Sequence, residues 1–315
     1  MYGENMRKWL DSEKPETYDF RDEIVGFKGR DTINRFFIYK ALDIAKKPPN
    51  YLGSEDARSC VKSETSGESA GYERGREADN CSLIQAVYWY LWEERYLAYC
   101  RKDSGLLTGE TMNSCFTTIA EYLKPSINKF QMSADCRKAR WGNQKLFCLY
   151  YDNKELATEL LEPAREFLKS AYTIGNFIPV PKGCNDPRGK GPTQDYWDLA
   201  LFAVYKWYAE KDSAGLEDML QNQDGKVALY VNWLIAFGSW DRFVIANYMQ
   251  DFVNPAGATD KGIFGCPKEL WEGHFKGKTL PSEKQCEEFF RNADKLIRAR
   301  SRRMIYALQA TEDTQ

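Results

Sequence analysis

Four segments that would be apolar on almost every side as helices constrain the fold more than any other feature of the chain. They are residues 81–102, 196–211, 227–237 and 240–253. A helix that is hydrophobic all round is normally buried in a protein interior. The chain shows neither a strand–helix alternation nor an internal repeat. We therefore expect a mainly α fold of about eight helices around one core, with a minor β element near residues 176–181.

The composition is sufficient for one large unit. Of the 315 residues, 43% are hydrophobic and 14% are aromatic, which is enough for a sizeable core. Residues 50–79 are rich in Gly, Ser and Glu, and this composition predicts a mobile loop. We expect a single helical domain over residues 1–315. The alternative is a division into an N-terminal helical part, residues 1–150, and a motif-bearing C-terminal part, residues 151–315.

The connector, residues 172–199, joins two helical regions and concentrates small, rigid and polar residues. Gly175 and Asn176 tolerate positive φ and therefore suit the end of a helix. The apolar run at residues 177–180 is held extended by prolines, which limits it to an edge strand. Residues 184–193 are rich in Gly and Pro, and this predicts a turn-rich loop before the next helix.

Three motifs of the C-terminal half resemble the signature of an uncharacterised bacterial protein family. They are T-I-G-N-F-x-P-x-P from Thr173, N-x-x-R-G from Asn185 and D-Y-W-D-L-A-L from Asp195. The similarity continues through Phe237–Val253 and Arg300–Ile305, covers about residues 155–308 and implies no known activity. The pattern T-I-G-N-x-x-x-x-P-x-x-x-N is also similar to the Asn-containing half of HNH-type restriction endonucleases. The histidine that serves those enzymes as general base has no counterpart before Thr173.

Polar residues inside apolar patterns need partners, either within the protein or from a ligand. Asp195 and Asp198 illustrate this, because their spacing places both carboxylates on one face at a predicted helix start. We predict nine ligand-binding residues: Asn176, Asn185, Arg188, Asp195, Asp198, Asn247, Gln250, Arg300 and Arg303. The alternatives are an internal hydrogen-bond network and, for the basic residues of the last helix, a solvated face. The pattern identifies no catalytic residue and no metal ligand.

The last helix begins at a capping box formed by Ser282 and Gln285. Its apolar stripe consists of Phe289, Ala293, Leu296 and Met304. Arg300 lies on the same stripe, where a guanidinium cannot remain buried without a partner and cannot lose its proton at neutral pH. We therefore expect Arg300 to meet one of the connector acids, Asp195 or Asp198. Asp251 is the alternative partner.

Several common chemistries lack the residues that they need. His274 is the only histidine, and a lone histidine in a loop is usually a surface residue. Residues 67–71, GESAG, imitate the nucleophile elbow of α/β-hydrolases, but no buried strand leads into them and no helix follows. Residues 273–279 imitate a phosphate loop with one residue too few. Nine scattered cysteines without a C-x-x-C motif predict reduced thiols and no structural zinc.

Charge and hydropathy narrow the classes of function. The net charge is −2 and the sequence pI is about 5.8, so nucleic acid is not indicated as a partner. No apolar run could span a membrane and no leader-like segment is seen, so we expect a cytoplasmic protein. These absences favour a non-catalytic intracellular binding or interaction protein without a cofactor, whose partner is an anionic ligand or a protein.

The alternative is a Mg²⁺-dependent enzyme that acts on a phosphate-bearing substrate such as nucleic acid. Asp195 and Asp198 would hold the metal ion, because Mg²⁺ prefers carboxylate oxygens. Arg300 or Arg303 would hold the phosphate.

Overall fold

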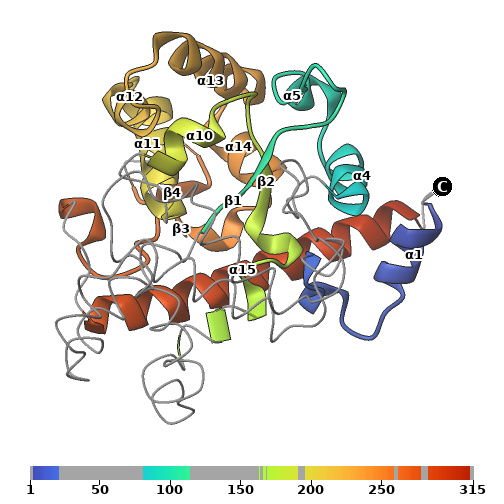
Figure 1. Cartoon of the computed structure of the whole chain (residues 1–315). Coiled ribbons are helices and arrows are strands. Elements are labelled where there is room, and N and C mark those ends of the chain that lie inside the picture. The colour runs from blue at the N-terminus through green and yellow to red at the C-terminus, as the bar shows by residue number, and fades with distance from the viewer. Residues whose placement is uncertain are drawn as a thin grey trace, which may run out of the picture.

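The structure of the chain is a computed structural model, shown in Figure 1. It describes residues 3–20, 81–113, 163, 166–167, 169–190, 196–258, 262–277 and 283–312. This part of the chain is mainly helical and includes two small antiparallel sheets, which confirms the predicted fold class. Asp195, the loop expected at residues 50–79 and the elbow-like residues 67–71 lie outside the described residues.

The longest element is α15, Glu283–Glu312, a helix of 30 residues that crosses the molecule in Figure 1. The predicted apolar stripe of this helix is buried, and Arg300 on that stripe has no exposed surface. Four elements from distant parts of the sequence pack against α15: η1 (Pro15–Thr17), α4 (Ser82–Leu91), η5 (Ile174–Asn176) and η6 (Gln250–Phe252). α15 therefore forms the axis of the described fold.

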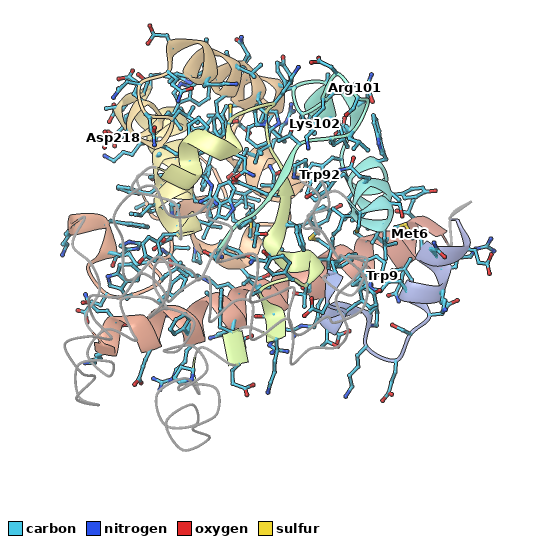
Figure 2. All side chains as sticks on the ribbon, in the orientation of Figure 1. Met6, Trp9, Trp92, Arg101, Lys102 and Asp218 are labelled. Atoms are coloured by element: carbon cyan, nitrogen blue, oxygen red, sulfur yellow. The ribbon has the colours of Figure 1, made fainter. Side chains whose placement is uncertain are left out.

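The shorter helices surround this axis. They are α1 (Glu4–Leu10), α5 (Glu94–Leu97), α10 (Asn185–Lys190), α11 (Trp197–Glu210), α12 (Ala214–Met219), α13 (Asp224–Phe237), α14 (Trp240–Ala246) and the short 3₁₀ turn η7 (His274–Lys276). The predicted helix at residues 196–211 corresponds to α11 and ends at Lys211, which adopts the left-handed conformation with φ 59°. Met6 and Trp9 of α1 are buried near the C-terminal end of α15 (Figure 2).

Three local predictions were wrong, the first two because a contact far along the sequence overrides the local pattern. The expected helix at residues 81–102 breaks at Trp92, which is extended (φ −115°, ψ 140°) and donates from its indole N–H to Asn247. Residues 108–123, whose pattern also predicts a helix, begin instead with the strand β1 (Gly109–Thr111), which pairs with residues 177–179. The expected loop at residues 184–193 contains α10, since Pro187 lies in the first turn, where a missing N–H does not matter.

Each sheet has two strands. β1 (Gly109–Thr111) pairs antiparallel with β2 (Phe177–Pro179), and Glu110 lies opposite Ile178. Within the described ranges β2 pairs with no second strand, so Pro179 is tolerated on an edge strand as predicted. β3 (Val253–Pro255) pairs antiparallel with β4 (Phe264–Pro267), with an irregularity between Val253 and Pro255.

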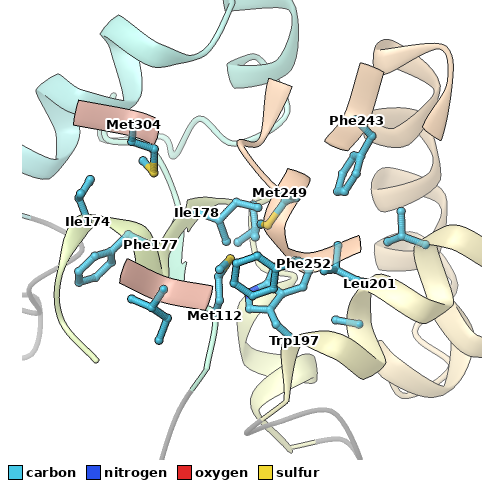
Figure 3. Packing of buried hydrophobic residues seen from close by; sticks show 14 of the residues in the cluster. Met112, Ile174, Phe177, Ile178, Trp197, Leu201, Phe243, Met249, Phe252 and Met304 are labelled. Atoms are coloured by element: carbon cyan, nitrogen blue, oxygen red, sulfur yellow. The ribbon is translucent and has the colours of Figure 1, made fainter. Parts of the chain in front are cut away.

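The connector and the neighbouring helices share one core. Figure 3 shows Phe177 and Ile178 of β2 close to residues of α11, α14 and α15 within one group of buried side chains. Trp197 at the start of α11 and Phe252 of η6 belong to the same group. The described apolar residues of the connector are therefore part of this core. No helix in the described ranges combines the length and the apolar character needed to cross a membrane.

Candidate functional site: a buried aspartate–histidine pair

The side chains of Asp198 and His274 form a buried pair between the first turn of α11 and the turn η7. The Nδ1 atom of His274 lies 2.6 Å from Oδ2 of Asp198, and the two side chains are 3% and 1% exposed. The same Oδ2 accepts a hydrogen bond from the backbone N–H of Leu270 at 2.8 Å, and Oδ1 accepts one from the N–H of Leu199 at 2.9 Å. Asp198 therefore accepts hydrogen bonds through both oxygens.

These contacts determine which ring nitrogen of His274 carries the proton. Because Asp198 acts as an acceptor, Nδ1 of the neutral imidazole donates and Nε2 keeps its lone pair. No residue within the described ranges forms a hydrogen bond with Nε2. A histidine held in this way through Nδ1 can take a proton at Nε2, and the carboxylate then stabilises the imidazolium.

Aromatic rings surround the histidine. The imidazole stacks on Trp271, with ring centroids 3.3 Å apart, and meets the edge of Tyr196 at 5.0 Å. Phe275 lies next along the turn and stacks on Phe202 of α11. This environment is of low polarity, so the hydrogen bond between Asp198 and His274 is stronger than it would be in water.

The turn that carries His274 is tied to its surroundings by side chains. Glu269 accepts hydrogen bonds from the N–H groups of Gly273 and Phe275, at 2.9 and 2.8 Å. Asn292 of α15 donates to the carbonyl of Leu270 at 2.8 Å. The backbone before and after His274 is therefore fixed by contacts to side chains outside the turn.

The expectation that His274 is a surface residue was wrong. It is buried because its loop folds onto the start of α11, where Asp198 provides a charged partner. Asp198 was predicted as a ligand-binding residue, but sequence reasoning missed its partner 76 positions away. The flanking aromatic residues Trp271 and Phe275 were the one sequence signal that could have indicated burial.

Asn176 is fully buried, and its amide is used within the protein. It donates to the carbonyls of Asn113 and Ala171, at 2.9 and 2.7 Å, and accepts from the N–H of Asn113. The side chain of Asn113 in turn accepts from the N–H of Trp197 at 3.1 Å, at the start of α11. Through Asn113, Asn176 is thus linked to the first residue of α11, the helix that carries Asp198.

Asn185 and Arg188 lie on α10 and bind the strand β1. Asn185 donates to the carbonyl of Gly109 at 3.3 Å, and Arg188 donates to those of Thr111 and Met112 at 3.2 Å. Arg188 also forms a buried ion pair with Glu110, with Nε 2.8 Å from Oε2. Burial raises the pKa of Glu110, although the neighbouring Arg188 opposes this shift.

Arg300 points inward, as predicted, but its expected pairing with Asp198 or Asp251 was wrong. Its guanidinium donates to three backbone carbonyls: those of Asn247 at 2.9 Å, Gly175 at 2.7 Å and Phe177 at 2.8 Å. The physical reason is that two short helical segments, α14 and η5, end beside Arg300, and their last carbonyls need donors. Asp198 binds His274 instead.

The remaining predicted residues lie apart from the pair. Asn247 is buried and accepts a hydrogen bond from the indole of Trp92 at 3.0 Å. Oε1 of Gln250 is buried and has no hydrogen-bond partner in the described part of the chain. Arg303 forms an ion pair with Asp251 on the surface. No group of three or more His, Cys, Asp or Glu side chains that could hold a metal ion is found among the described residues.

Together, the fold and the pair define a mainly α protein with one buried carboxylate–imidazole centre. The chain belongs to a family of unknown function, DUF6994, whose family model matches residues 103–304. The match begins upstream of the similarity that the motifs indicated and therefore includes β1, Glu110 and Asn113. No curated protein and no solved structure matches the chain. The similarity to HNH-type nucleases stays a prediction.

Proposed function

We propose that this member of the DUF6994 family is an enzyme in which His274 acts as a general base and Asp198 orients it. The observation that supports the proposal is the hydrogen bond of 2.6 Å between Nδ1 and Asp198, together with an Nε2 atom that has no partner among the described residues. In the proposed step Nε2 takes the proton of a water or hydroxyl nucleophile, whose oxygen then bonds to the carbonyl carbon of an acyl substrate, and the bond from that carbon to the leaving group breaks. The imidazolium later returns the proton to the leaving group.

Three other residues predicted to bind a ligand use their side chains within the protein, which leaves His274 as the stronger candidate for chemistry. Asn176, Arg188 and Arg300 form hydrogen bonds within the protein that tie the connector to β1, α11 and α15. The two oxygens of Asp198 accept N–H donors, which gives no support for a Mg²⁺ ion at this carboxylate. The Mg²⁺-dependent alternative therefore depends on Asp195 alone.

The first test measures whether Nε2 is reachable in the native protein. Diethyl pyrocarbonate acylates unprotonated imidazole, and the chain has a single histidine, so the absorbance change at 240 nm reports His274 alone. We expect one equivalent to react in the native protein and none in His274→Gln. Reaction only after unfolding would show that His274 is purely structural and would refute the proposal.

The second test measures catalysis with p-nitrophenyl acetate and p-nitrophenyl butyrate as probes of acyl transfer. Loss of a general base typically reduces a rate by about 10²–10⁴-fold, and we expect a loss of that order in His274→Gln. Asp198→Asn should show a similar loss, because the asparagine amide favours the wrong tautomer of the histidine. Arg303→Ala is the control and should retain the wild-type rate, because Arg303 pairs with Asp251 on the surface.

A second candidate is a non-catalytic interaction protein, and one surface observation favours it. Trp89 and Leu106 are each 42% exposed, and the guanidinium of Arg101 lies 5.2 Å from the Trp89 ring centroid. Exposed Trp and Arg are enriched where proteins bind each other. This candidate is preferred if His274 does not react in the native protein. An intracellular location is part of both proposals, supported by the free thiols of the buried Cys100 and Cys184.

A further inference from the structure

The carboxylate of Glu269 brackets His274 along the backbone. One oxygen accepts from the N–H of the residue before the histidine, Gly273, at 2.9 Å, and the other accepts from the residue after it, Phe275, at 2.8 Å. The backbone N–H of His274 itself donates to the carbonyl of Trp271. The three successive amides from Gly273 to Phe275 are therefore all held by acceptors, and two of these acceptors belong to one side chain.

This bracket holds an unusual backbone conformation. Gly273 has φ +83°, in the left-handed region, and η7 begins immediately after it. A short turn of this kind has few backbone hydrogen bonds of its own, so a side-chain acceptor decides where its N–H groups point. The direction of the His274 side chain follows from the backbone that Glu269 fixes.

We propose that Glu269 is the positioning residue that keeps Nδ1 of His274 on Asp198. The inference rests on the proposed function, since it assigns to Glu269 the orientation of the proposed base. Asp198 is anchored separately, because it belongs to the first turn of α11 and accepts from Leu199 of the same helix. His274 lies on a loop outside such a helix, so Glu269 is what fixes its position relative to Asp198.

Glu288 of α15 provides a matched control. Its carboxylate also accepts a hydrogen bond from the same loop, from the N–H of Glu272 at 3.2 Å, but it does not contact the amides on either side of His274. If any carboxylate contact with the loop were sufficient, Glu269→Ala and Glu288→Ala would have equal effects. If Glu269 positions the histidine, the two variants differ.

The experiment is nitrogen NMR of protein labelled with ¹⁵N-histidine, in which a single imidazole is observed. In the wild type we expect a downfield Nδ1–H proton and ¹⁵N shifts typical of a protonated Nδ1 and a bare Nε2. Asp198→Asn should abolish this signature. Glu269→Ala should also lose the Nδ1–H resonance while the circular dichroism spectrum stays native, whereas Glu288→Ala should retain it.

The outcomes separate the two proposals. A wild-type spectrum without the Nδ1–H signature would overturn the aspartate–histidine pair and with it the proposed function. A wild-type signature that persists in Glu269→Ala would overturn only the role of Glu269. If Glu269→Ala does not fold, Glu269→Gln decides, because glutamine keeps an oxygen acceptor for only one of the two N–H groups of Gly273 and Phe275. A weakened resonance in that variant supports positioning, and an unchanged resonance refutes it.

Discussion

Replacing Arg300 by alanine is expected to lower the free energy of unfolding by about 3–5 kcal/mol, because three buried carbonyls lose their donors and a cavity is left. The guanidinium donates to the backbone carbonyls of Gly175, Phe177 and Asn247. A buried acceptor that loses its donor costs about 1–3 kcal/mol, so three carbonyls account for about 3 kcal/mol at the lower limit. The cavity left by a fully buried side chain adds to this cost.

The variant Arg300→Met separates charge from volume. Burial lowers the pKa of Arg300 to about 9, because the charged form loses its hydration, but the group remains protonated at neutral pH. Methionine and alanine both remove the buried charge and leave the same carbonyls without donors, but methionine fills most of the space and so avoids most of the cavity. We therefore expect a smaller loss of stability than in the alanine variant, about 3 kcal/mol.

The matched control is Arg303→Ala, three residues further along α15. Arg303 is 45% exposed and its partner is Asp251, so its loss should cost no more than about 1 kcal/mol. The assay is equilibrium unfolding in urea, followed by circular dichroism, with the denaturant slope compared among the variants. If Arg300→Ala unfolds within about 1 kcal/mol of Arg303→Ala, the three carbonyl contacts do not stabilise the fold as argued.

Three further predictions concern the surroundings of the connector, and a fourth concerns all the cysteines. Gly175→Ala should prevent native folding, measured by circular dichroism, because the added Cβ would lie 2.1 Å from the carbonyl oxygen of Ile297; a native spectrum would contradict this close packing. Burial raises the pKa of Glu110, so its stabilising contribution is present below the unfolded value and lost as the pH rises through the folded value. The stability difference between the wild type and Glu110→Gln should therefore decrease as the pH is raised from the acidic range, and an increase would refute the argument. Burial raises the pKa of Cys184 to about 12, so its thiol should not react with Ellman's reagent at pH 8 in the native protein. All nine thiols should react after denaturation without reductant, and a count of five or fewer would indicate disulfides.

Helices with a strong internal pattern were predictable from the sequence. The stripe of α15 was identified by spacing alone, including the inward position of Arg300, because a period of 3.6 residues determines which side chains share a face. The helix α11 was also found to within one residue at each end. In both cases the local pattern and the tertiary packing favour the same structure.

Elements determined by distant partners were not predictable. The pattern of residues 81–102 predicts one helix, yet the helix ends before Trp92, which donates a hydrogen bond to Asn247, 155 residues away. Residues 109–111 form a strand only because β2 lies beside them, and each strand has three residues. A strand this short has no periodicity to detect, so only its pairing partner reveals it.

The partner of Arg300 illustrates a limit of reasoning from charge. A buried cation was expected to require an anion, but backbone carbonyls at helix ends carry partial negative charge and are acceptors. Gly175 makes this possible, since the absence of a side chain lets η5 approach α15 closely enough for Ser301 to accept from its N–H at 2.9 Å. The sequence shows the charge of a residue but not which backbone groups will lack partners near it.

The connector motifs T-I-G-N and N-x-x-R-G are better explained by architecture than by chemistry, and this changes where function should be sought. In T-I-G-N the glycine permits contact with α15 and the asparagine joins Asn113 to the start of α11. In N-x-x-R-G the asparagine and the arginine bind β1 from one face of α10. Because these polar groups form hydrogen bonds within the protein, a ligand would have to displace existing contacts at considerable cost. His274 differs, because Asp198 holds one ring nitrogen and leaves the other without a partner in the described structure. The proposed chemistry therefore lies at His274, which is outside the motifs, and the carboxylate of Asp198, which is inside one, orients it.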